Sequence, residues 1–562
     1  EGRTMRLFSL ALLASLALSA PTPLTYHEGI TGSLDAKAIT HNCQAEPATP
    51  ETGCQCRDPN DHSASAKCSR QPDGECKIKG HDGWGTCSYE CCVDQPSELV
   101  TAILVDVGST KSEPHIYSWP NHTSYNITER DSGCGKLKPG LASFVKMPLD
   151  KLDAAIADYL KPLTDCLART TDAGTRVHVY ATGGMRMLTG GQADAIWLAV
   201  HRWMAHTKFA YSRSDGDTIS GNQEGVFAYL NAIDAVTTPS VSEIHEDRGK
   251  LQAVLYDDER ENDEEEKEEE KMLMGQLDPS RPHWLGIIDM GGASLQVSFT
   301  PRRQTTVLQD SYPVILPAVR MRANVYSTSY QRFGQDAAMA RYVSMLQKSG
   351  EQAADVAWPT ASSAYEQGPT RAACFNKGFN GTMMNADGAK VQIVGVGDYA
   401  ACREQVQGLL GLDCECLTNP CAMHGVYQPS VEGVTFFAGA TFFYTINGLK
   451  DKSYSKIDGA YRPTPEQIMH AGESQCALPY ETAINGDKFG GNYCFSSAYI
   501  NAVLEAMRIP SDSTQIVYTV KVPPGSSSPE SFDWARGAQL HLNTMQELYQ
   551  HKPLEPNNWG SI

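Results

Sequence analysis

The chain has 562 residues, of which 41% are hydrophobic and 20% charged, proportions typical of a globular protein. One hydrophobic core rarely supports so long a chain, so we expect two or more packed units. The formal net charge of −19 argues against a general nucleic-acid binder, because no basic surface is available to neutralise phosphates.

The N-terminal residues 1–19 are typical of a signal peptide. Met5 and Arg6 precede the apolar run LFSLALLASLAL, which ends in small residues at Ala20. The run is too short to span a bilayer. Among later segments, residues 434–446 form the longest apolar run, and we expect them in the core rather than in a membrane. We therefore expect a protein without a transmembrane anchor, secreted or in the lumen of the secretory pathway.

Cysteine usage agrees with that compartment. The chain has 17 cysteines, and sequons at Asn121, Asn126 and Asn380 suit a glycoprotein. Eight cysteines crowd into one short segment: Cys43, Cys54, Cys56, Cys68, Cys76, Cys87, Cys91 and Cys92. We expect a disulfide-stapled module there, with a zinc site as the alternative. The odd total leaves one cysteine unpaired or pairing outside the chain, so a disulfide-linked oligomer is possible.

Strands and helices are predicted in alternation from about residue 98. The stretch LVTAILVDVGST, residues 99–110, predicts a buried strand and a tight turn, and HIYSW, residues 115–119, predicts the second strand of a hairpin. Helical spacing follows at 151–167. Residues 175–188 predict a strand, a glycine turn and the start of a helix. Residues 219–233 predict an apolar-periodic helix that opens with Gly221.

The second half of the chain restarts the same pattern after an acidic run at 257–271. We interpret that run as a solvated surface insertion, with a calcium-binding or partner-binding strip as the alternative. WLGIIDMGGASLQVSF, residues 284–299, then repeats the strand and glycine turn. The remaining predicted elements are a strand and loop at 391–399 and helices around 496–508 and 533–549. This alternation predicts two α/β lobes.

Two loops carry the same pattern of residues. Asp106 and Asp289 each end an apolar strand and are followed two positions later by glycine. Glycine lets backbone N–H groups turn towards an anion, and the aspartate could hold a divalent cation such as Mg²⁺ beside a phosphate. One loop per lobe could grip a polyphosphate from both sides. Arg186, after the glycine turn at 183–184, could brace that turn by pairing with a carboxylate.

Several motifs in order carry a family resemblance. ILVDVGST, YATGGMR, GNQEGVFAYLN, GIIDMGGASLQVSF, YCFSSAYI and FDWARGA resemble the apyrase-conserved regions of the GDA1/CD39 nucleoside triphosphate diphosphohydrolase family. The resemblance covers residues from about 100 to 545. It implies an actin/Hsp70-like (RNase H-like) fold, with two related lobes, a nucleotide between them and a C-terminal helix that returns to the first lobe. It also implies hydrolysis of nucleoside tri- and diphosphates with Ca²⁺ or Mg²⁺.

The resemblance also implies roles for individual residues. Glu224 corresponds to the catalytic base, although a glutamate at a helix start is by itself more often a dipole partner. Gln296 would place the attacking water, and Ser294, also expected among the catalytic residues, would contact phosphate. The expected metal positions, mostly through water, are Asp106, Asp289, Thr182 and Trp534. The expected phosphate positions are Gly108, Ser109, Thr110, Lys111, Gly183, Gly184, Gly291, Gly292 and Ala293. Tyr444 and Tyr499 are expected to stack on the base.

The resemblance leaves alternatives open. A phosphatase or kinase of the same fold could act on polyphosphate or another acceptor, and an inactive relative could keep nucleotide binding. The base preference and the ratio of triphosphate to diphosphate hydrolysis are not predicted. The predicted segments are 1–19 (signal peptide), 40–97 (cysteine-rich module), 98–240 (lobe I), 241–275 (acidic linker), 276–510 (lobe II) and 511–562 (segment returning to lobe I).

Overall fold

The computed structural model describes most of the chain from residue 99 onward and four earlier strands. The described ranges are 55–58, 61–70, 76–80, 83–87, 99–120, 127–237, 285–301, 307, 309–316, 321–355, 369–522 and 530–550. The predicted signal peptide, the acidic run and the sequons at Asn121 and Asn126 lie outside these residues. The chain divides into two compact units, Glu1–Ser97 and Glu98–Ile562, which are described separately.

The first unit contains one sheet of four strands in sequence order, and each neighbouring pair is antiparallel. The strands are β1 (Gln55–Asp58), β2 (Asp61–Arg70), β3 (Cys76–Gly80) and β4 (Gly83–Cys87). They fall within the cysteine-rich segment. Whether its cysteines form disulfides or a zinc site lies outside what the structure describes.

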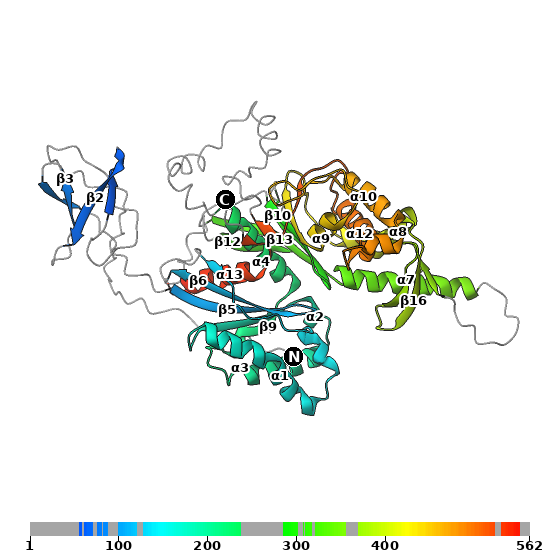
Figure 1. Cartoon of the computed structure of the whole chain (residues 1–562), viewed down its shortest axis with the longest axis horizontal. Coiled ribbons are helices and arrows are strands. Elements are labelled where there is room, and N and C mark those ends of the chain that lie inside the picture. Colours follow the sequence, from blue (N-terminus) through cyan, green and yellow to red (C-terminus); the bar gives the residue numbers. More distant parts are fainter. Residues whose placement is uncertain are drawn as a thin grey trace, which may run out of the picture. The chain divides into compact units, whose positions relative to one another are not determined.

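The second unit contains two large sheets of related topology (Figure 1). The first sheet has the order β7-β6-β5-β8-β9. Its strands are β5 (Leu99–Val107), β6 (Ser112–Pro120), β7 (Thr128–Arg130), β8 (Arg176–Ala181) and β9 (Gly216–Thr218). An antiparallel hairpin, β5–β6, lies at its centre, and β8 and β9 continue it in parallel.

The second sheet repeats this plan with one more edge strand, in the order β12-β13-β11-β10-β17-β18. Its strands are β10 (Leu285–Met290), β11 (Ser294–Phe299), β12 (Ser311–Leu316), β13 (Met321–Gln331), β17 (Thr435–Ala440) and β18 (Ile516–Tyr518). The hairpin β10–β11 is again antiparallel, and β17 and β18 again continue it in parallel. The two halves therefore share one topology.

Two helices lie between the sheets. Helix α4 (Gly221–Thr237) contacts the strands β10, β11, β12 and β13, and α13 (Ala535–Gln550) contacts α4, β5 and β6. Their apolar residues share one buried core with residues of both sheets. A Cβ added to Gly537 would collide with the main-chain oxygen of Phe227, so the two helix backbones pack directly together. Buried Asp234 and Arg536 form an ion pair of 2.8 Å across this contact.

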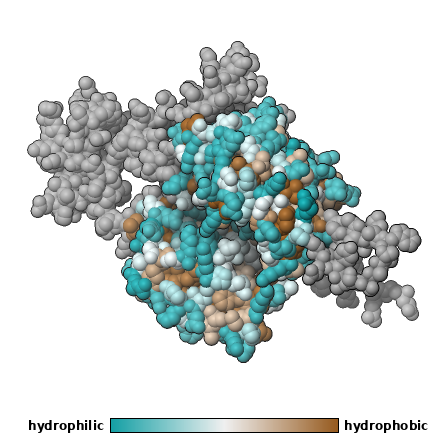
Figure 2. All heavy atoms as spheres, turned by 45° about the vertical axis from the view of Figure 1, so that its right-hand side comes forward, coloured by the Kyte–Doolittle hydropathy of each residue, from teal (hydrophilic) through white to brown (hydrophobic). Residues whose placement is uncertain are grey.

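Other helices cover the outer faces of the sheets. On the first sheet these are α1 (Leu149–Thr170) and α3 (Gly190–Met204), which enclose a core with β5 and β8. On the second sheet they are α7 (Gln335–Asp355), α8 (Tyr399–Gln407), α9 (Thr441–Gly448), α10 (Pro465–Ala477) and α12 (Tyr493–Ala506). Hydrophilic residues are interspersed with small hydrophobic patches on the face shown in Figure 2.

The apolar run at 434–446 forms strand β17 and the start of helix α9. Its phenylalanines are buried, as Phe436 and Phe437 illustrate with no exposed surface. The expectation that this run belongs to the core is therefore confirmed. None of the described helices combines the length and the apolar composition that crossing a membrane requires.

Candidate active site between the two sheets

The two repeated aspartates occupy equivalent positions in the two sheets. Asp106 and Asp289 are the penultimate residues of β5 and β10, the first strand of each sheet. Asp106 lies opposite Glu113 in the β5–β6 hairpin, and Asp289 lies opposite Gln296 in the β10–β11 hairpin. The offset is seven residues in both hairpins, so Glu113 is the counterpart of Gln296.

The glycine loops that follow these strands approach one another. A Cβ built on Gly184 would lie 2.8 Å from the Cα of Ser109, and one built on Gly292 would lie 3.2 Å from the Ser109 hydroxyl. A Cβ on Gly183 would lie 2.8 Å from that of Ala293. The structure thus brings three predicted phosphate loops together. Gly108, Thr110 and Gly291 belong to the same turns, and the Gly108 amide donates to the Lys111 carbonyl at 2.9 Å.

Glu224 lies in a hydrogen-bonded network at the start of α4. The Arg186 guanidinium donates from Nη2 to Glu224 Oε2 at 2.6 Å and to Ser294 Oγ at 3.0 Å. Gln296 Nε2 donates to Ser294 Oγ at 2.8 Å and lies 3.3 Å from Glu224 Oε2. Arg186 therefore pairs with a carboxylate, as expected, and that carboxylate is Glu224. The network joins the glycine turn of the first half to strand β11 of the second.

Further bonds hold Arg186 in this position. Its Nη1 donates to the Ile219 carbonyl at 3.0 Å, and its Nε donates to Gln331 Oε1 at 3.1 Å. Gln331 in turn donates to the Gly183 carbonyl at 3.2 Å. Gln331 was not predicted from the sequence.

The carboxylates of the site are poorly solvated. Burial raises the pKa of Asp106 and of Asp289 to about 7, and the negative charges of Glu224 and Asp533 add to both increases. Burial also raises the pKa of Glu224, although Arg186 opposes this increase through its charge and its hydrogen bond. Asp106, Asp289, Glu224 and Asp533 therefore share one region, in which Arg186 offsets part of the charge of Glu224 and His115 part of that of Asp106.

A divalent cation fits this donor set. Asp106 Oδ1 is buried and has no hydrogen-bond partner among the described residues. Carboxylate oxygens are the ligands that Mg²⁺ and Ca²⁺ prefer, and a bound cation would offset the repulsion between Asp106, Asp289 and their acidic neighbours. The residues predicted to hold a cation are thus chemically suited to it.

Asp533 is an acidic residue of this region that sequence reasoning missed. It precedes α13, and its Oδ1 accepts from the backbone N–H groups of Ala535 at 3.0 Å and Arg536 at 3.3 Å. Burial raises the pKa of Asp533. Its only signal in the sequence is its place in the motif FDWARGA, beside Trp534, the residue of that motif that was expected near the metal. Trp534 itself is 5% exposed and belongs to the core between the sheets.

The other predicted residues are placed as follows. Thr182 is buried, and its N–H donates to the Val107 carbonyl at 3.1 Å, which holds the second turn against the first. Lys111 pairs with Glu113, and Lys136 pairs with the same carboxylate at 2.6 Å. Glu113 therefore pairs with two ammonium groups, whereas its counterpart in the second hairpin, Gln296, contacts Ser294.

The two tyrosines predicted to stack on a base lie in different environments. Tyr444 on α9 is 60% exposed, so its ring is accessible. Tyr499 on α12 is 1% exposed, stacks on Phe495 and donates its hydroxyl hydrogen to the Phe333 carbonyl at 2.9 Å. In this conformation Tyr499 belongs to the hydrophobic core and offers no accessible ring face. The structure does not bring it to the site.

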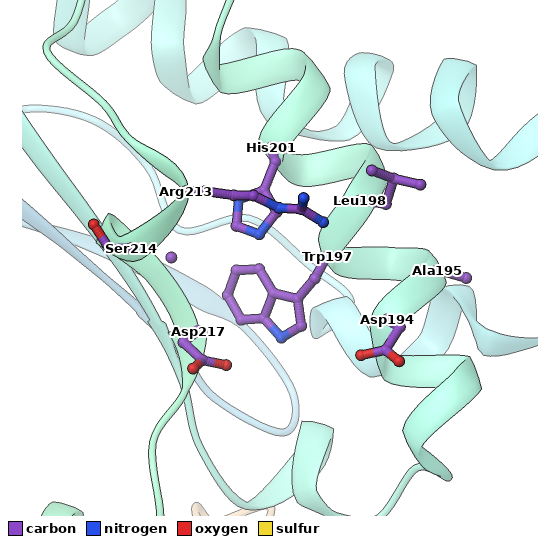
Figure 3. A pocket seen from close by; sticks show the side chains of 9 residues that line it. Asp194, Ala195, Trp197, Leu198, His201, Arg213, Ser214 and Asp217 are labelled. Carbon is purple, nitrogen blue, oxygen red and sulfur yellow. The ribbon is translucent and has the colours of Figure 1, made fainter.

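A surface pocket of about 720 Å³ lies elsewhere, between α3 and β9 (Figure 3). Trp197 lies at its centre with His201 and Arg213 on one side, and Asp194 and Asp217 lie on others. None of the residues predicted for the active site lines this pocket. The site between the sheets is therefore defined by its converging polar residues, and not by the size of a cavity.

Two α/β halves of one topology, with glycine loops meeting at their junction, define the actin/Hsp70-like class of fold, as predicted. Residues 93–556 match the GDA1/CD39 (nucleoside phosphatase) family. The chain belongs to that family, and the predicted family is confirmed.

Similar proteins agree with this assignment. The chain is 24% identical over 485 residues to "Ectonucleoside triphosphate diphosphohydrolase 2" of Gallus gallus, covering 83% of this chain and 88% of that protein. It is 22% identical over 451 residues to "Probable apyrase 3" of Arabidopsis thaliana, covering 78% and 82%. A solved structure of nucleoside triphosphate hydrolases from Neospora caninum resembles it with a TM-score of 0.52, 16% identity and coverage of 81% and 94%.

Proposed function

We propose that this protein is a divalent-metal-dependent hydrolase that removes the terminal phosphate of nucleoside tri- and diphosphates. The observation that carries the proposal is the network in which Gln296 contacts both Glu224 and Ser294, beside glycine loops from both halves. Family membership and the names of the relatives support the same reaction. Glu224 has no covalent role in this proposal.

Glu224 would act as the general base towards the attacking water. A carboxylate can take that proton only when it is ionised, and burial disfavours ionisation. The bond from Arg186 at 2.6 Å counteracts that effect and fixes the carboxylate. Gln296 Nε2, within 3.3 Å of the same carboxylate, would orient the water in line with the terminal phosphorus.

The glycine loops would bind the phosphate oxygens. Their close approach at Ser109, Gly184 and Gly292 leaves no room for side chains, so main-chain N–H groups and hydroxyls would contact the substrate. Asp106 and Asp289 would hold Ca²⁺ or Mg²⁺ mostly through water, with Thr182 and Trp534 near the same water molecules. The cation supplies positive charge that offsets the charge of the phosphates.

Release of phosphate tests this proposal. Purified full chain should release phosphate from ATP and ADP in the presence of Ca²⁺ or Mg²⁺, and EDTA should abolish the release. Release from polyphosphate alone, or transfer to an acceptor other than water, would favour the polyphosphatase or kinase alternative. Nucleotide binding without hydrolysis under every metal condition would identify an inactive relative.

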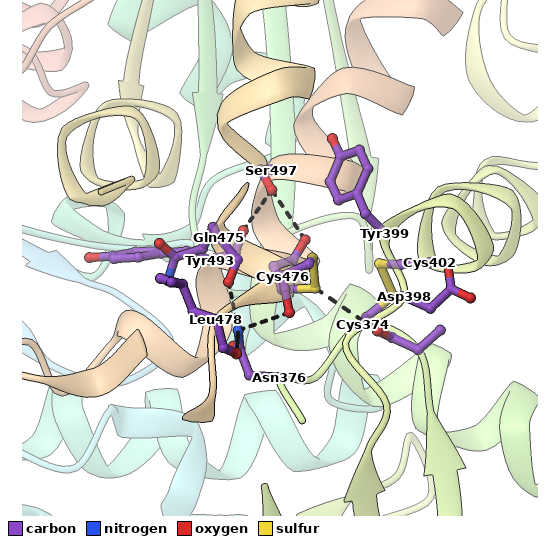
Figure 4. The surroundings of a disulfide bond; sticks show 12 residues. Cys374, Asn376, Asp398, Tyr399, Cys402, Gln475, Cys476, Leu478, Tyr493 and Ser497 are labelled. Atoms are coloured by element: carbon purple, nitrogen blue, oxygen red, sulfur yellow. Dashed lines mark hydrogen bonds between the residues drawn. A yellow bond between two sulfur atoms is a disulfide. The ribbon is translucent and has the colours of Figure 1, made fainter. Parts of the chain in front are cut away.

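We further propose that the protein works in the secretory pathway or outside the cell. Four disulfides occur among the described cysteines: Cys134–Cys166, Cys374–Cys402, Cys416–Cys421 and Cys476–Cys494. Figure 4 shows one of these regions, where Asn376 donates to the Gln475 carbonyl at 2.6 Å beside the sulfur atoms. Disulfides persist in oxidising compartments. Cys414 is the unpaired cysteine of the described set, and the Asn380 sequon is exposed on β15 (Asn380–Met384).

A further inference from the structure

A histidine and two carboxylates converge beside the proposed active site. His115 lies on β6, Glu129 lies on β7, and Asp533 precedes α13. One potential ligand atom from each lies within 4.8 Å of the others. His115 Nδ1 lies 2.7 Å from Glu129 Oε1. His115 and Glu129 have no role in the proposed hydrolysis, and Asp533 contributes only its negative charge near Asp106 and Asp289.

The strand register places the side chains on one face of the first sheet. His115 lies opposite Leu104, and Tyr117 lies opposite Glu129. Directly paired residues share a face, as do residues two apart in a strand, so His115, Tyr117 and Glu129 all face α13. The His115 imidazole stacks on the Tyr117 ring, with centroids 6.0 Å apart and planes 4° apart. This stacking fixes the direction in which the imidazole nitrogens point.

A second observation indicates that a ligand belongs here. The Tyr117 hydroxyl is fully buried, and it has no hydrogen-bond partner among the described residues. Asp533 and Glu129 are among the charged groups that act on it. A buried hydroxyl without a partner destabilises the fold, and a bound ion or its water would supply the missing partner. The two carboxylates and the imidazole around it are metal-ligating groups.

We propose that His115, Glu129 and Asp533 form a second cation site, which binds a borderline divalent ion such as Zn²⁺. The imidazole distinguishes it from the all-oxygen site of Asp106 and Asp289, because Ca²⁺ and Mg²⁺ prefer oxygen whereas Zn²⁺ binds nitrogen and oxygen together. On binding, the proton shared by His115 Nδ1 and Glu129 Oε1 is released to solvent, and both side chains bind the ion instead. The proposal does not depend on the hydrolase function.

An ion at this site would join two parts of the fold. His115 and Glu129 belong to the first sheet, whereas Asp533 caps the helix that packs between the sheets. The ion would therefore fasten the N-terminus of α13 to β6 and β7. Because an ion that binds only the folded chain stabilises it, Zn²⁺ should raise the thermal unfolding midpoint.

Equilibrium dialysis against Zn²⁺ tests the proposal. The full chain is dialysed in excess Mg²⁺, which occupies the oxygen site, and bound zinc is measured for wild type, His115→Phe and Glu129→Ala. His541→Phe is the matched control, because His541 also lies against an aromatic ring, that of Phe227 at 5.4 Å, but outside the cluster. Thermal unfolding of each variant with and without Zn²⁺ gives a second readout that is independent of activity.

We expect wild type and His541→Phe to bind one more zinc per chain than His115→Phe. Glu129→Ala should weaken that site at least tenfold and remove most of the thermal stabilisation by Zn²⁺. Equal zinc binding by wild type, His115→Phe and Glu129→Ala would overturn the proposal and leave the cluster as an ion pair only. If His115→Phe fails to fold, Glu129→Ala decides, because Glu129 is an exposed residue on the edge strand β7 and its side chain is only partly buried.

Discussion

Replacing Glu224 with glutamine separates catalysis from folding. The amide keeps an oxygen that can accept from Arg186, so the shape of the site changes little. It cannot take a proton from water, because its oxygen is a far weaker base than a carboxylate. Glu224→Gln should therefore remove hydrolysis while nucleotide binding persists.

The expected loss of catalysis in Glu224→Gln is larger than the expected loss of stability. General base catalysis contributes about 10²–10⁴-fold, so kcat should fall by that factor, which corresponds to about 3–5 kcal/mol of transition-state stabilisation. The 2.6 Å contact from Arg186 changes from an ion pair to a hydrogen bond that the guanidinium charge alone assists, so part of its worth of about 1.5–3 kcal/mol is lost. The expected loss of unfolding free energy is thus about 1–2 kcal/mol. Glu224 is 8% exposed, so water recovers little of it.

The assay combines kinetics, binding and unfolding. Phosphate release from ATP gives kcat and KM, a fluorescent nucleotide analogue gives affinity, and thermal unfolding gives stability. Asp234→Asn is the matched control, because Asp234 also lies on α4, is buried and pairs with an arginine at 2.8 Å. It should cost comparable stability with kcat within about threefold of wild type.

Two results would refute this reasoning. If Glu224→Gln kept more than about a tenth of the wild-type kcat, Glu224 would not be the base. If Asp234→Asn lost as much activity as Glu224→Gln at equal stability, the effect would come from movement of α4 and not from proton transfer.

Three further predictions concern the metal and the loops. Asp106→Asn and Asp289→Asn should each lower activity at least tenfold at limiting Mg²⁺, and excess Mg²⁺ should partly restore it in a metal titration; an effect at only one aspartate would contradict the shared role. Burial raises the pKa of Asp106 and of Asp289 from 3.8 to about 7. Between these two pH values the metal-free native state therefore binds more protons than the unfolded state. The unfolding free energy of the metal-free protein should therefore fall as pH rises from about 4 to 7. Denaturant unfolding in EDTA should show that this free energy depends less on pH in Asp106→Asn and in Asp289→Asn than in wild type. Gly184→Ala should lower kcat/KM at least tenfold, because its Cβ would press on the Ser109 backbone at 2.8 Å, whereas Gly191→Ala, with nothing within 4 Å, should behave as wild type.

The repeated architecture was predictable because it depends on local patterns. The apolar run ending at Asp106 and the run ending at Asp289 both predicted buried strands with glycine turns, and both form. The glycine turn at 183–184 lies beside these loops because the parallel pairing of β8 with β5 aligns their carboxyl ends. Strand β13 and helix α7 were not predicted, since neither was singled out by a comparable pattern.

The less predictable features depend on long-range contacts. The side-chain partners of Arg186 come from α4, β11 and β13, which are 38, 108 and 145 positions away. Asp533 gives no sign in the sequence that it approaches His115, because that contact arises from the return of α13 to the first sheet. Tyr499 could not be distinguished from Tyr444 by residue type, and only packing shows that the former lies in the core.

The position of α13 has a consequence for synthesis of the protein. Ala535, Ala538 and Leu540 complete the core shared by both sheets, and Asp533 joins the acidic region around Asp106. Each half of the chain can begin to fold on the ribosome, but the core that joins them cannot close until this last helix has emerged. The surfaces of α4, β5 and β6 that α13 covers therefore stay exposed on the nascent chain until α13 has been made.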